Sequence, residues 1–344
     1  MKILIVTDAW VPQMNGVVRT LLATKAELER IGHVVMVISP NEYQSFPCPT
    51  YPEIRLAVTR GAWIGKRIDA FQPDAIHLAT EGPLCLAARR WCLRNKMQFT
   101  TAYHTQFPEY IAARTLLPTE WVWKYIKWFH APARHVLVST ASIRERLAGH
   151  GIVHTVAWGR GVDLTIFAPD APPPKQFANL PRPIQIYVGR VAVEKNIEGF
   201  LDTHHPGSKV IVGDGPARTA LERHYPEAHF LGALKGRDLA GAFAGADVFV
   251  FPSRTDTFGL VILEALACGT PVAAFPVSGP ADIITPLSGA LDINLEKAIV
   301  GALTLSRDDC AFYGSTFTWA ASTAQFIDAL VPTRLKSSDW PIAA

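Results

Sequence analysis

Apolar residues in this chain gather into short runs, and most runs are followed by a longer stretch with the periodicity of a helix. Residues 3–6 read ILIV, a helix is predicted from about 17 to 31, and a second strand follows at 33–39. Four more short apolar runs are separated by helical patterns, at residues 74–79, 98–104, 135–140 and 154–158. This alternation predicts a mostly parallel sheet that is covered by helices on both faces.

A proline-rich stretch interrupts the pattern near residue 170, and the alternation restarts at Ile184. With 344 residues, the chain is long enough for two domains that each have a core. We expect a first domain at 1–169, a linker at 170–183, a second domain at 184–318, a C-terminal helix at 319–331 that crosses back to the first domain, and a tail at 332–344.

Residues 249–274 read FVFPSRTDTFGLVILEALACGTPVAA and carry the most distinctive pattern: a strand, a polar loop, a helix that opens at Phe258 and Gly259, and another strand. Glu264 lies in the middle of this helix, where no face is solvated. A buried carboxylate is costly without a hydrogen-bond donor. Its partner is therefore expected to be a ligand or a buried donor, and a core helix with Glu264 bound to an internal arginine is the alternative.

Asp256 lies in the loop just before this helix. Between the two acids, the backbone N–H groups of Phe258, Gly259 and Leu260 are expected at a helix N-terminus, which favours phosphate binding. Carboxylates accept hydrogen bonds from sugar and ribose hydroxyls. The combination predicts a site for a sugar nucleotide.

Other candidate site residues follow predicted strands, where ligands of parallel sheets bind. They are Gly16, Glu81, His104, Arg190, Lys195 and the glycine pair Gly213 and Gly215. Arg190 and Lys195 flank one loop, where two cations suit a diphosphate. The two glycines suit either the close approach of a base or a tight turn, and Glu81 either contacts the acceptor or caps the following helix. The first loop lacks G-x-G-x-x-G, which argues against an NAD site.

The segment PSxxDxFGxxxLEAxAxGxPV resembles the donor-site motif of family 4 of the retaining glycosyltransferases, in which most members have Glu at the position of Asp256. The resemblance extends from Gly16 to Trp319 and includes the hinge-like RGVD at 160–163. It implies the α/β GT-B fold, in which two Rossmann-like doubly wound domains face a cleft. It also implies a nucleobase held near residues 230–235 and a histidine, here His104, beside the transferred sugar.

Composition and charge refine this picture. The chain has no apolar run of membrane-spanning length and no leader at its start, so we expect a cytoplasmic protein, with peripheral attachment to the inner face of a membrane left open. Five scattered cysteines indicate reduced core residues. Residues 1–165 hold 19 Lys+Arg against 12 Asp+Glu, which favours an anionic partner or a solvated basic face. Residues 119–136 read either as an interfacial amphipathic helix or as a core helix.

The resemblance therefore implies a retaining hexosyltransferase with α linkage, which takes GDP-mannose or a UDP-hexose as donor and a lipid or glycan as acceptor. Among relatives, the chain most resembles bacterial α-mannosyltransferases and diacylglycerol glycosyltransferases. Asp256 is expected to hold the sugar hydroxyls and Glu264 the ribose, while Arg190 and Lys195 neutralise the diphosphate without a metal or any other cofactor. Nucleic acid is not an expected partner. The alternatives are a nucleotide-sugar epimerase of the same fold and a nucleotide-binding protein without catalysis.

Overall fold

The computed structural model describes residues 1–13, 15–48, 51–59, 61–104, 118–254, 256 and 258–334, without the side chains of residues 48 and 51–54. Its contacts divide the chain into two compact units. The first comprises Met1–Gly159 and the segment from Ser322 onward, and the second comprises Arg160–Ala321. The proline-rich stretch 170–183, predicted as a linker, belongs to the second unit, because Phe177 is buried in the core of that unit.

The first unit is built on a six-stranded sheet with the order β2-β1-β5-β6-β7-β8, in which all neighbouring pairs are parallel. Its strands are β1 (Lys2–Val6), β2 (Val34–Ile38), β5 (Ala75–Leu78), β6 (Thr100–Tyr103), β7 (Val136–Val138) and β8 (Thr155–Ala157), with an antiparallel hairpin of β3 (Ser45–Cys48) and β4 (Tyr51–Ala57). Its helices are α1 (Gly16–Arg30), η1 (Pro40–Glu42), α2 (Gly61–Phe71), α3 (Pro83–Arg94), α5 (Thr119–His130), α6 (Ala141–Gly149) and most of α14 (Trp319–Ala329).

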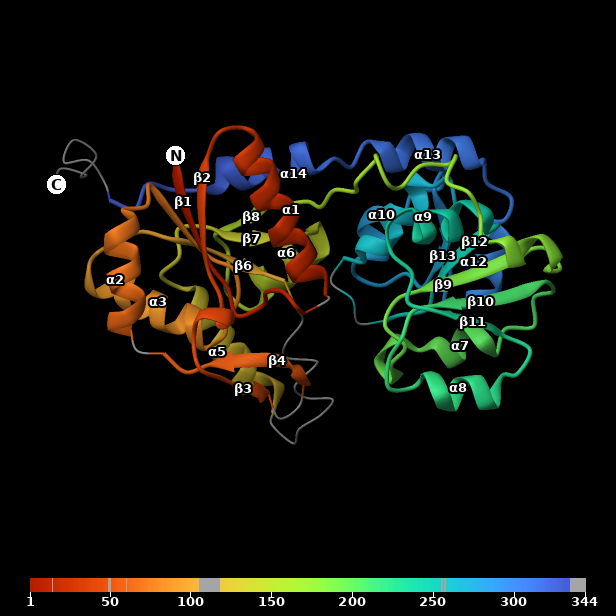
Figure 1. Ribbon diagram of the computed structural model, residues 1–344, viewed down its shortest axis with the longest axis horizontal. Helices are drawn as coiled ribbons and strands as arrows, with labels where there is room; N and C mark the ends of the chain where they lie inside the picture. The colour runs from red at the N-terminus through yellow and green to blue at the C-terminus, as the bar shows by residue number, and fades with distance from the viewer. Residues whose placement is uncertain are drawn as a thin grey trace. The chain divides into compact units, whose positions relative to one another are not determined.

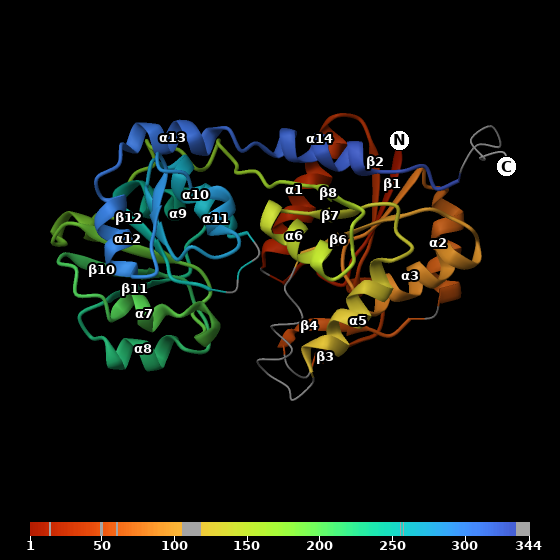
Figure 2. The same cartoon turned by 180° about the vertical axis from the view of Figure 1, so that it is seen from behind.

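The side chains of β1 point alternately to the two faces of this sheet, and both faces are covered by helices. Leu4 and Val6 pack with apolar residues of α2, α3 and α5, whereas Ile3 and Ile5 pack with residues of α1 and α14. Successive side chains of a strand point to opposite faces, so a fully apolar strand needs helices on both. In Figures 1 and 2, α1 near the N-terminus and α14 near the C-terminus lie side by side over one face.

The second unit repeats this design with a parallel sheet of order β11-β10-β9-β12-β13-β14. Its strands are β9 (Ile184–Val188), β10 (Ser208–Val212), β11 (His229–Gly232), β12 (Val248–Phe251), β13 (Val272–Ala274) and β14 (Gly289–Leu291). Its helices are η2 (Lys175–Asn179), η3 (Val193–Lys195), α7 (Ile197–Leu201), α8 (Arg218–His224), α9 (Gly236–Gly245), α10 (Leu260–Ala267), α11 (Pro280–Ile283), α12 (Leu295–Ala302) and α13 (Arg307–Ser315). Helices α9, α10 and α13 cover one face, and α7, α8 and α12 the other (Figure 1).

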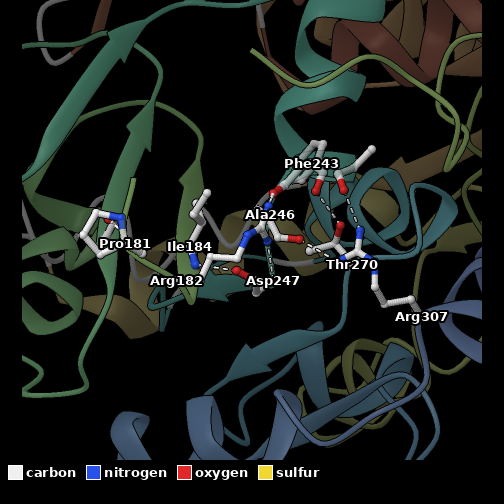
Figure 3. A network of polar contacts seen from close by, with 11 residues as sticks. Pro181, Arg182, Ile184, Phe243, Ala246, Asp247, Thr270 and Arg307 are labelled. Carbon is white, nitrogen blue, oxygen red and sulfur yellow. Dashed lines mark hydrogen bonds and ion pairs between the residues drawn. The ribbon is translucent and has the colours of Figure 1, made fainter. Parts of the chain in front are cut away.

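A polar network fixes the amino-terminal ends of β9 and β12 in the second sheet (Figure 3). Asp247, just before β12, accepts a 2.5 Å bond from Arg182 and a 2.6 Å bond from the backbone N–H of Ile184. Arg307 donates to the carbonyls of Ala246 and Ala244 at 2.5 and 2.7 Å. These carbonyls end α9, where cations are favourable. This edge of the sheet is thus occupied by structural contacts, which leaves the carboxyl edge for ligands.

The two parallel sheets and their double helical cover confirm the fold predicted from the sequence. The sequence analysis named no ranges for the hairpin β3–β4 or for the helices α2 and α13. The segment of α5 was left open between an interfacial and a core helix. Trp121 and Trp128 are 69% and 46% exposed, whereas Trp123 and Phe129 are buried. The helix is therefore amphipathic, with aromatic residues on both sides.

Two further expectations can be compared with the described residues. Cys85, Cys92, Cys268 and Cys310 are free and buried, as expected for reduced core residues. In the described part of the chain, no helix combines the length and apolar character needed to cross a membrane.

Candidate active site

The second sheet brings Lys195 and Asp256 together at its topological switch point. Strands β9 and β12 are neighbours, but the connections after them lead to opposite sides of the sheet, and ligands of such sheets bind at this point. Lys195 follows β9 and Asp256 follows β12, and Lys195 Nζ lies 2.5 Å from Asp256 Oδ1. Both side chains are largely enclosed, at 18% and 20% exposure. The predicted diphosphate-binding cation is therefore paired with the predicted sugar-binding acid.

Asn196 holds the Lys195 loop in place and was not among the predicted site residues. Its backbone is left-handed, with φ of 53°, and its side chain donates a 3.1 Å bond to the carbonyl of Pro252 at the end of β12. Asparagine adopts this conformation more readily than most residues, so the signal was present in the sequence. Asn196 thus ties together the two loops that carry Lys195 and Asp256.

Arg190 lies at the same edge, directly after β9. The hydroxyl of Tyr187 donates a 2.8 Å bond to the carbonyl of Arg190. Burial, together with the charges of Asp256 and Glu194, raises the pKa of Tyr187 well above its usual range, so the hydroxyl keeps its proton. The backbone of Arg190 is therefore held by a permanent donor from within the sheet.

Gly213 and Gly215 allow the loop after β10 to approach the loop after β9. A Cβ on Gly213 would lie 1.8 Å from the carbonyl oxygen of Gly189, and one on Gly215 would lie 2.3 Å from that of Val191. Both contacts are with the chain's own backbone. The described residues thus give a third reason for the two glycines, a close approach between neighbouring loops, and the approach of a base stays a prediction.

Helix α10 begins at Leu260, with Gly259 as its N-cap at φ of 87°. Phe258 lies before the helix, so the predicted start is slightly early, because the left-handed glycine delays the first helical turn. Glu264 is 2% exposed, which confirms its predicted burial. Ser253, just after β12, is also buried, and its hydroxyl has no hydrogen-bond partner among the described residues. Ser253 is thus a second residue that the sequence analysis missed, because its buried hydroxyl lies at the sheet edge where ligands are expected.

The first sheet has its own switch point, between β1 and β5. Asp8 follows β1 and accepts bonds from the hydroxyl of Thr80 at 2.9 Å and from the backbone N–H of Leu84 at 2.8 Å. Leu84 lies in the first turn of α3, so Asp8 caps this helix from a distant part of the chain. Glu81 does not cap the helix, since its side chain lies 3.3 Å from the ring of His130 instead.

Gly16 and His104 also lie at the carboxyl edge of the first sheet. Gly16 is the first residue of α1, whose N-cap Asn15 accepts a 3.0 Å bond from the backbone N–H of Val18. His104 directly follows β6 and is buried, with its ring centroid 5.3 Å from that of Trp158. The residues after it that carry part of the family resemblance, from Thr105, lie outside the described residues. The predicted site residues therefore form two groups, one at the carboxyl edge of each sheet.

The group in the second unit has the chemistry of a nucleotide-sugar site. Two cations, Arg190 and Lys195, occur with two carboxylates, Asp256 and Glu264, and with the N-terminus of α10 at one sheet edge. Cations and a helix N-terminus suit a diphosphate, and carboxylates suit hydroxyl groups. The assignment of individual contacts remains a prediction.

Comparisons with known proteins identify the family. Residues 14–166 match the model described as Glycosyltransferase Family 4, and residues 182–303 match that described as Glycosyl transferases group 1. The chain is 33% identical to a GDP-mannose-dependent alpha-mannosyltransferase of Mycolicibacterium smegmatis, over 88% of each chain. It is 28% identical to an alpha-monoglucosyldiacylglycerol synthase of Streptococcus pneumoniae, over 80% of this chain and 71% of that protein.

A solved structure supports the fold. Sucrose-phosphate synthase from Thermosynechococcus elongatus superposes with a TM-score of 0.74 at 22% identity, over 95% of this chain and 97% of that chain. The sheet order of each unit and this likeness establish the GT-B fold. The chain therefore belongs to glycosyltransferase family 4 and is a glycosyltransferase that uses a nucleotide sugar.

Proposed function

We propose that this enzyme transfers a mannosyl group from GDP-mannose to a hydroxyl of a lipid or glycan acceptor, with an α linkage and retention of configuration. The observation that carries the proposal is the Lys195–Asp256 pair at the switch point of the second sheet. The GDP-mannose dependence printed for the relative from Mycolicibacterium smegmatis supports the choice of donor. A UDP-hexose is the alternative donor.

The Lys195–Asp256 pair provides a binding step. When the donor enters, Lys195 exchanges its carboxylate partner for the diphosphate, and Asp256 then accepts bonds from hydroxyls of the transferred sugar. Arg190 and the N–H groups at the start of α10 complete the diphosphate site. Glu264 binds the ribose, and the backbone at Gly213 and Gly215 admits the nucleotide. This charge arrangement needs no metal ion, because cations of the chain stabilise the leaving group.

In the transfer step, the bond between the anomeric carbon and the diphosphate oxygen breaks, and a bond to the acceptor oxygen forms on the same face of the sugar. The acceptor proton passes to the departing diphosphate oxygen. Gly16 allows the chain to approach the donor phosphates, and His104 lies beside the anomeric centre. No side chain acts as the nucleophile in this proposal.

A lipid acceptor at the cytoplasmic face of a membrane agrees with several features of the first unit. Residues 1–165 carry a net charge of +7, from 19 Lys+Arg and 12 Asp+Glu. On α5, Trp121 is 69% exposed beside Lys124, a composition suited to a membrane interface. One relative is named for a diacylglycerol product.

Ligand-induced thermal shifts in EDTA test the donor. A ligand at 100 times its Kd stabilises a protein by about 2.7 kcal/mol, so GDP should raise the unfolding temperature more than UDP, ADP or NAD does. Transfer is then measured with radiolabelled GDP-mannose or UDP-glucose and 1,2-dioleoylglycerol in phosphatidylglycerol vesicles, or methyl α-D-mannopyranoside in solution. The anomeric coupling of the product reports the linkage. A shift with UDP alone, and transfer from UDP-glucose alone, would contradict the mannosyl assignment.

A further inference from the structure

Glu81 occupies the position in the first unit that corresponds to the donor-binding edge in the second. It follows Thr80 at the carboxyl end of β5, the strand beside β1 at the switch point of the first sheet. Ligands of doubly wound sheets bind at such points. This location alone does not identify a ligand-binding residue, because a residue there can instead cap the N-terminus of the following helix, α3.

That structural role is filled by another residue. The N-terminus of α3 is capped by Asp8, whose carboxylate accepts from the backbone N–H groups of Leu84 at 2.8 Å and Cys85 at 3.4 Å. Thr80 donates a third bond to this carboxylate at 2.9 Å. Glu81 is therefore not needed as a cap, and its own carboxylate is directed to a different group.

A buried histidine holds the carboxylate of Glu81. Glu81 Oε1 lies 3.3 Å from Nε2 of His130, and the other ring nitrogen of His130 lies 2.8 Å from the hydroxyl of Thr101 on β6. The side chains of His130 and Glu81 are 0% and 4% exposed. The hydroxyl of Tyr125 also donates to the backbone carbonyl of Glu81. Helix α5 thus fixes both the backbone and the side chain of Glu81.

The second carboxylate oxygen of Glu81 is the informative feature. In the described part of the molecule, Oε2 receives no hydrogen bond and no ion pair. Oε2 is not among the fully enclosed polar atoms that lack a partner, so a donor from outside the chain, water or a ligand, can reach it. A hydroxyl group is the simplest ligand that does so, since it donates one hydrogen bond and carries no charge.

We infer that Glu81 Oε2 accepts a hydrogen bond from an acceptor hydroxyl other than the one that attacks the donor, and that His130 is the positioning residue that holds Glu81 in the orientation required. This inference rests on the proposed function, because it assumes that a hydroxyl-bearing acceptor binds the first unit. Glu81 aligns the acceptor and takes up no proton in the transfer step. Its contribution is thus to the binding and orientation of the acceptor.

The ratio of mannosyl transfer to donor hydrolysis tests the inference. Transfer from GDP-mannose to methyl α-D-mannopyranoside, which has further hydroxyls besides the one that attacks the donor, is measured together with release of free mannose. Glu81→Gln should raise the KM for the acceptor about tenfold to a hundredfold, the loss expected for a hydrogen bond to a charged group, and lower the transfer-to-hydrolysis ratio. Glu145→Gln, an exposed glutamate of α6, is the matched control and should leave both values near native.

The positioning role of His130 is tested by a double-mutant cycle. His130→Ala should raise the acceptor KM by a similar factor, and the double variant Glu81→Gln with His130→Ala should be no worse than either single variant. His130→Gln, which restores a donor, should recover part of the loss. Additive effects, or equal losses of transfer and hydrolysis in Glu81→Gln, would overturn the inference by indicating a general structural role.

The same measurements separate this inference from the proposed function. A native enzyme that hydrolyses UDP-glucose and not GDP-mannose contradicts the proposed donor, and the Glu81 comparison then proceeds with UDP-glucose. A native enzyme that transfers mannose, with a Glu81→Gln variant of unchanged acceptor KM, overturns the role of Glu81 and leaves the proposed function standing.

Discussion

Lys195 is the cation on which the proposed donor site depends most directly. It lies 2.5 Å from Asp256 at the switch point of the second sheet, where it meets the diphosphate in the proposed function. Lys195→Ala should lower kcat by about 10²-fold or more, because a preorganised cation stabilises the developing charge of the leaving group. Steady-state kinetics with GDP-mannose measure this loss.

The matched control for this prediction is Lys297→Ala, a lysine of α12 at the surface of the same unit. It makes the same charge change and should retain native kinetics. Thermal unfolding of Lys297→Ala should remain close to that of the native protein. Lys195→Ala leaves the largely enclosed carboxylate of Asp256 without this cation and should lower the Tm, so the kinetics are compared well below both unfolding temperatures. Native turnover in Lys195→Ala would rule out its role at the diphosphate.

Asp8 joins β1 to the start of α3, and its ionisation should be visible in the stability of these elements. Burial raises the pKa of Asp8 above its usual value, and this outweighs its hydrogen bonds from Leu84 and Thr80. The stability linked to a raised carboxyl pKa is fully present below the unfolded pKa and is lost as pH rises through the folded pKa. The side-chain amide of the variant Asp8→Asn does not ionise in this range.

The native protein should therefore lose stability relative to Asp8→Asn as the pH rises above the ordinary carboxyl pKa of about 4. The Tm of the native protein minus the Tm of Asp8→Asn should therefore decrease as the pH is raised. Asp74→Asn provides the comparison, because it removes a carboxylate of the same unit whose hydrogen bond to the backbone of Lys2 is exposed to solvent. A difference that grows with pH in favour of the native protein would contradict the burial argument.

The contact between the loops after β9 and β10 gives a second prediction at the level of elements. Gly213→Ala would place a Cβ 1.8 Å from the carbonyl oxygen of Gly189, so the loops must separate. We expect a lower Tm and weaker stabilisation by GDP, because the loop after β9 also carries Arg190 and Lys195. Gly149→Ala, where a Cβ would meet no atom within 4 Å, is the control and should match the native protein.

At the scale of the whole molecule, the excess of basic residues in the first half of the chain and an exposed tryptophan on α5 predict that this helix contacts a membrane. The first 165 residues carry 19 Lys+Arg against 12 Asp+Glu, and Trp121 on α5 is 69% exposed. Trp121→Ala should therefore weaken binding to phosphatidylglycerol vesicles in co-sedimentation, and added salt should weaken binding of both proteins. Phe312→Ala removes an aromatic residue that is 76% exposed in the second unit and should have no effect. Equal losses in both variants would contradict the assignment.

The sequence by itself determined the fold class and the burial of Glu264. Short apolar runs and helical periodicity predicted both parallel sheets, since the central strands are apolar on both sides. Glu264 was predicted to be buried because its neighbours leave no solvated face, and it is 2% exposed. Both predictions depend only on residues that are close together in the sequence, so no knowledge of the tertiary structure is needed to make them.

Tertiary structure decided which groups meet. Lys195 and Asp256 are 61 residues apart, and Asp8 and Leu84 are 76 apart, and only the strand orders bring each pair to one sheet edge. The roles of Asn196 and Ser253, the capping of α3 by Asp8 and the contact of Glu81 with His130 depend on such long-range placement. Periodicity specifies which face of an element is apolar, but not which loops lie beside one another once the elements have packed.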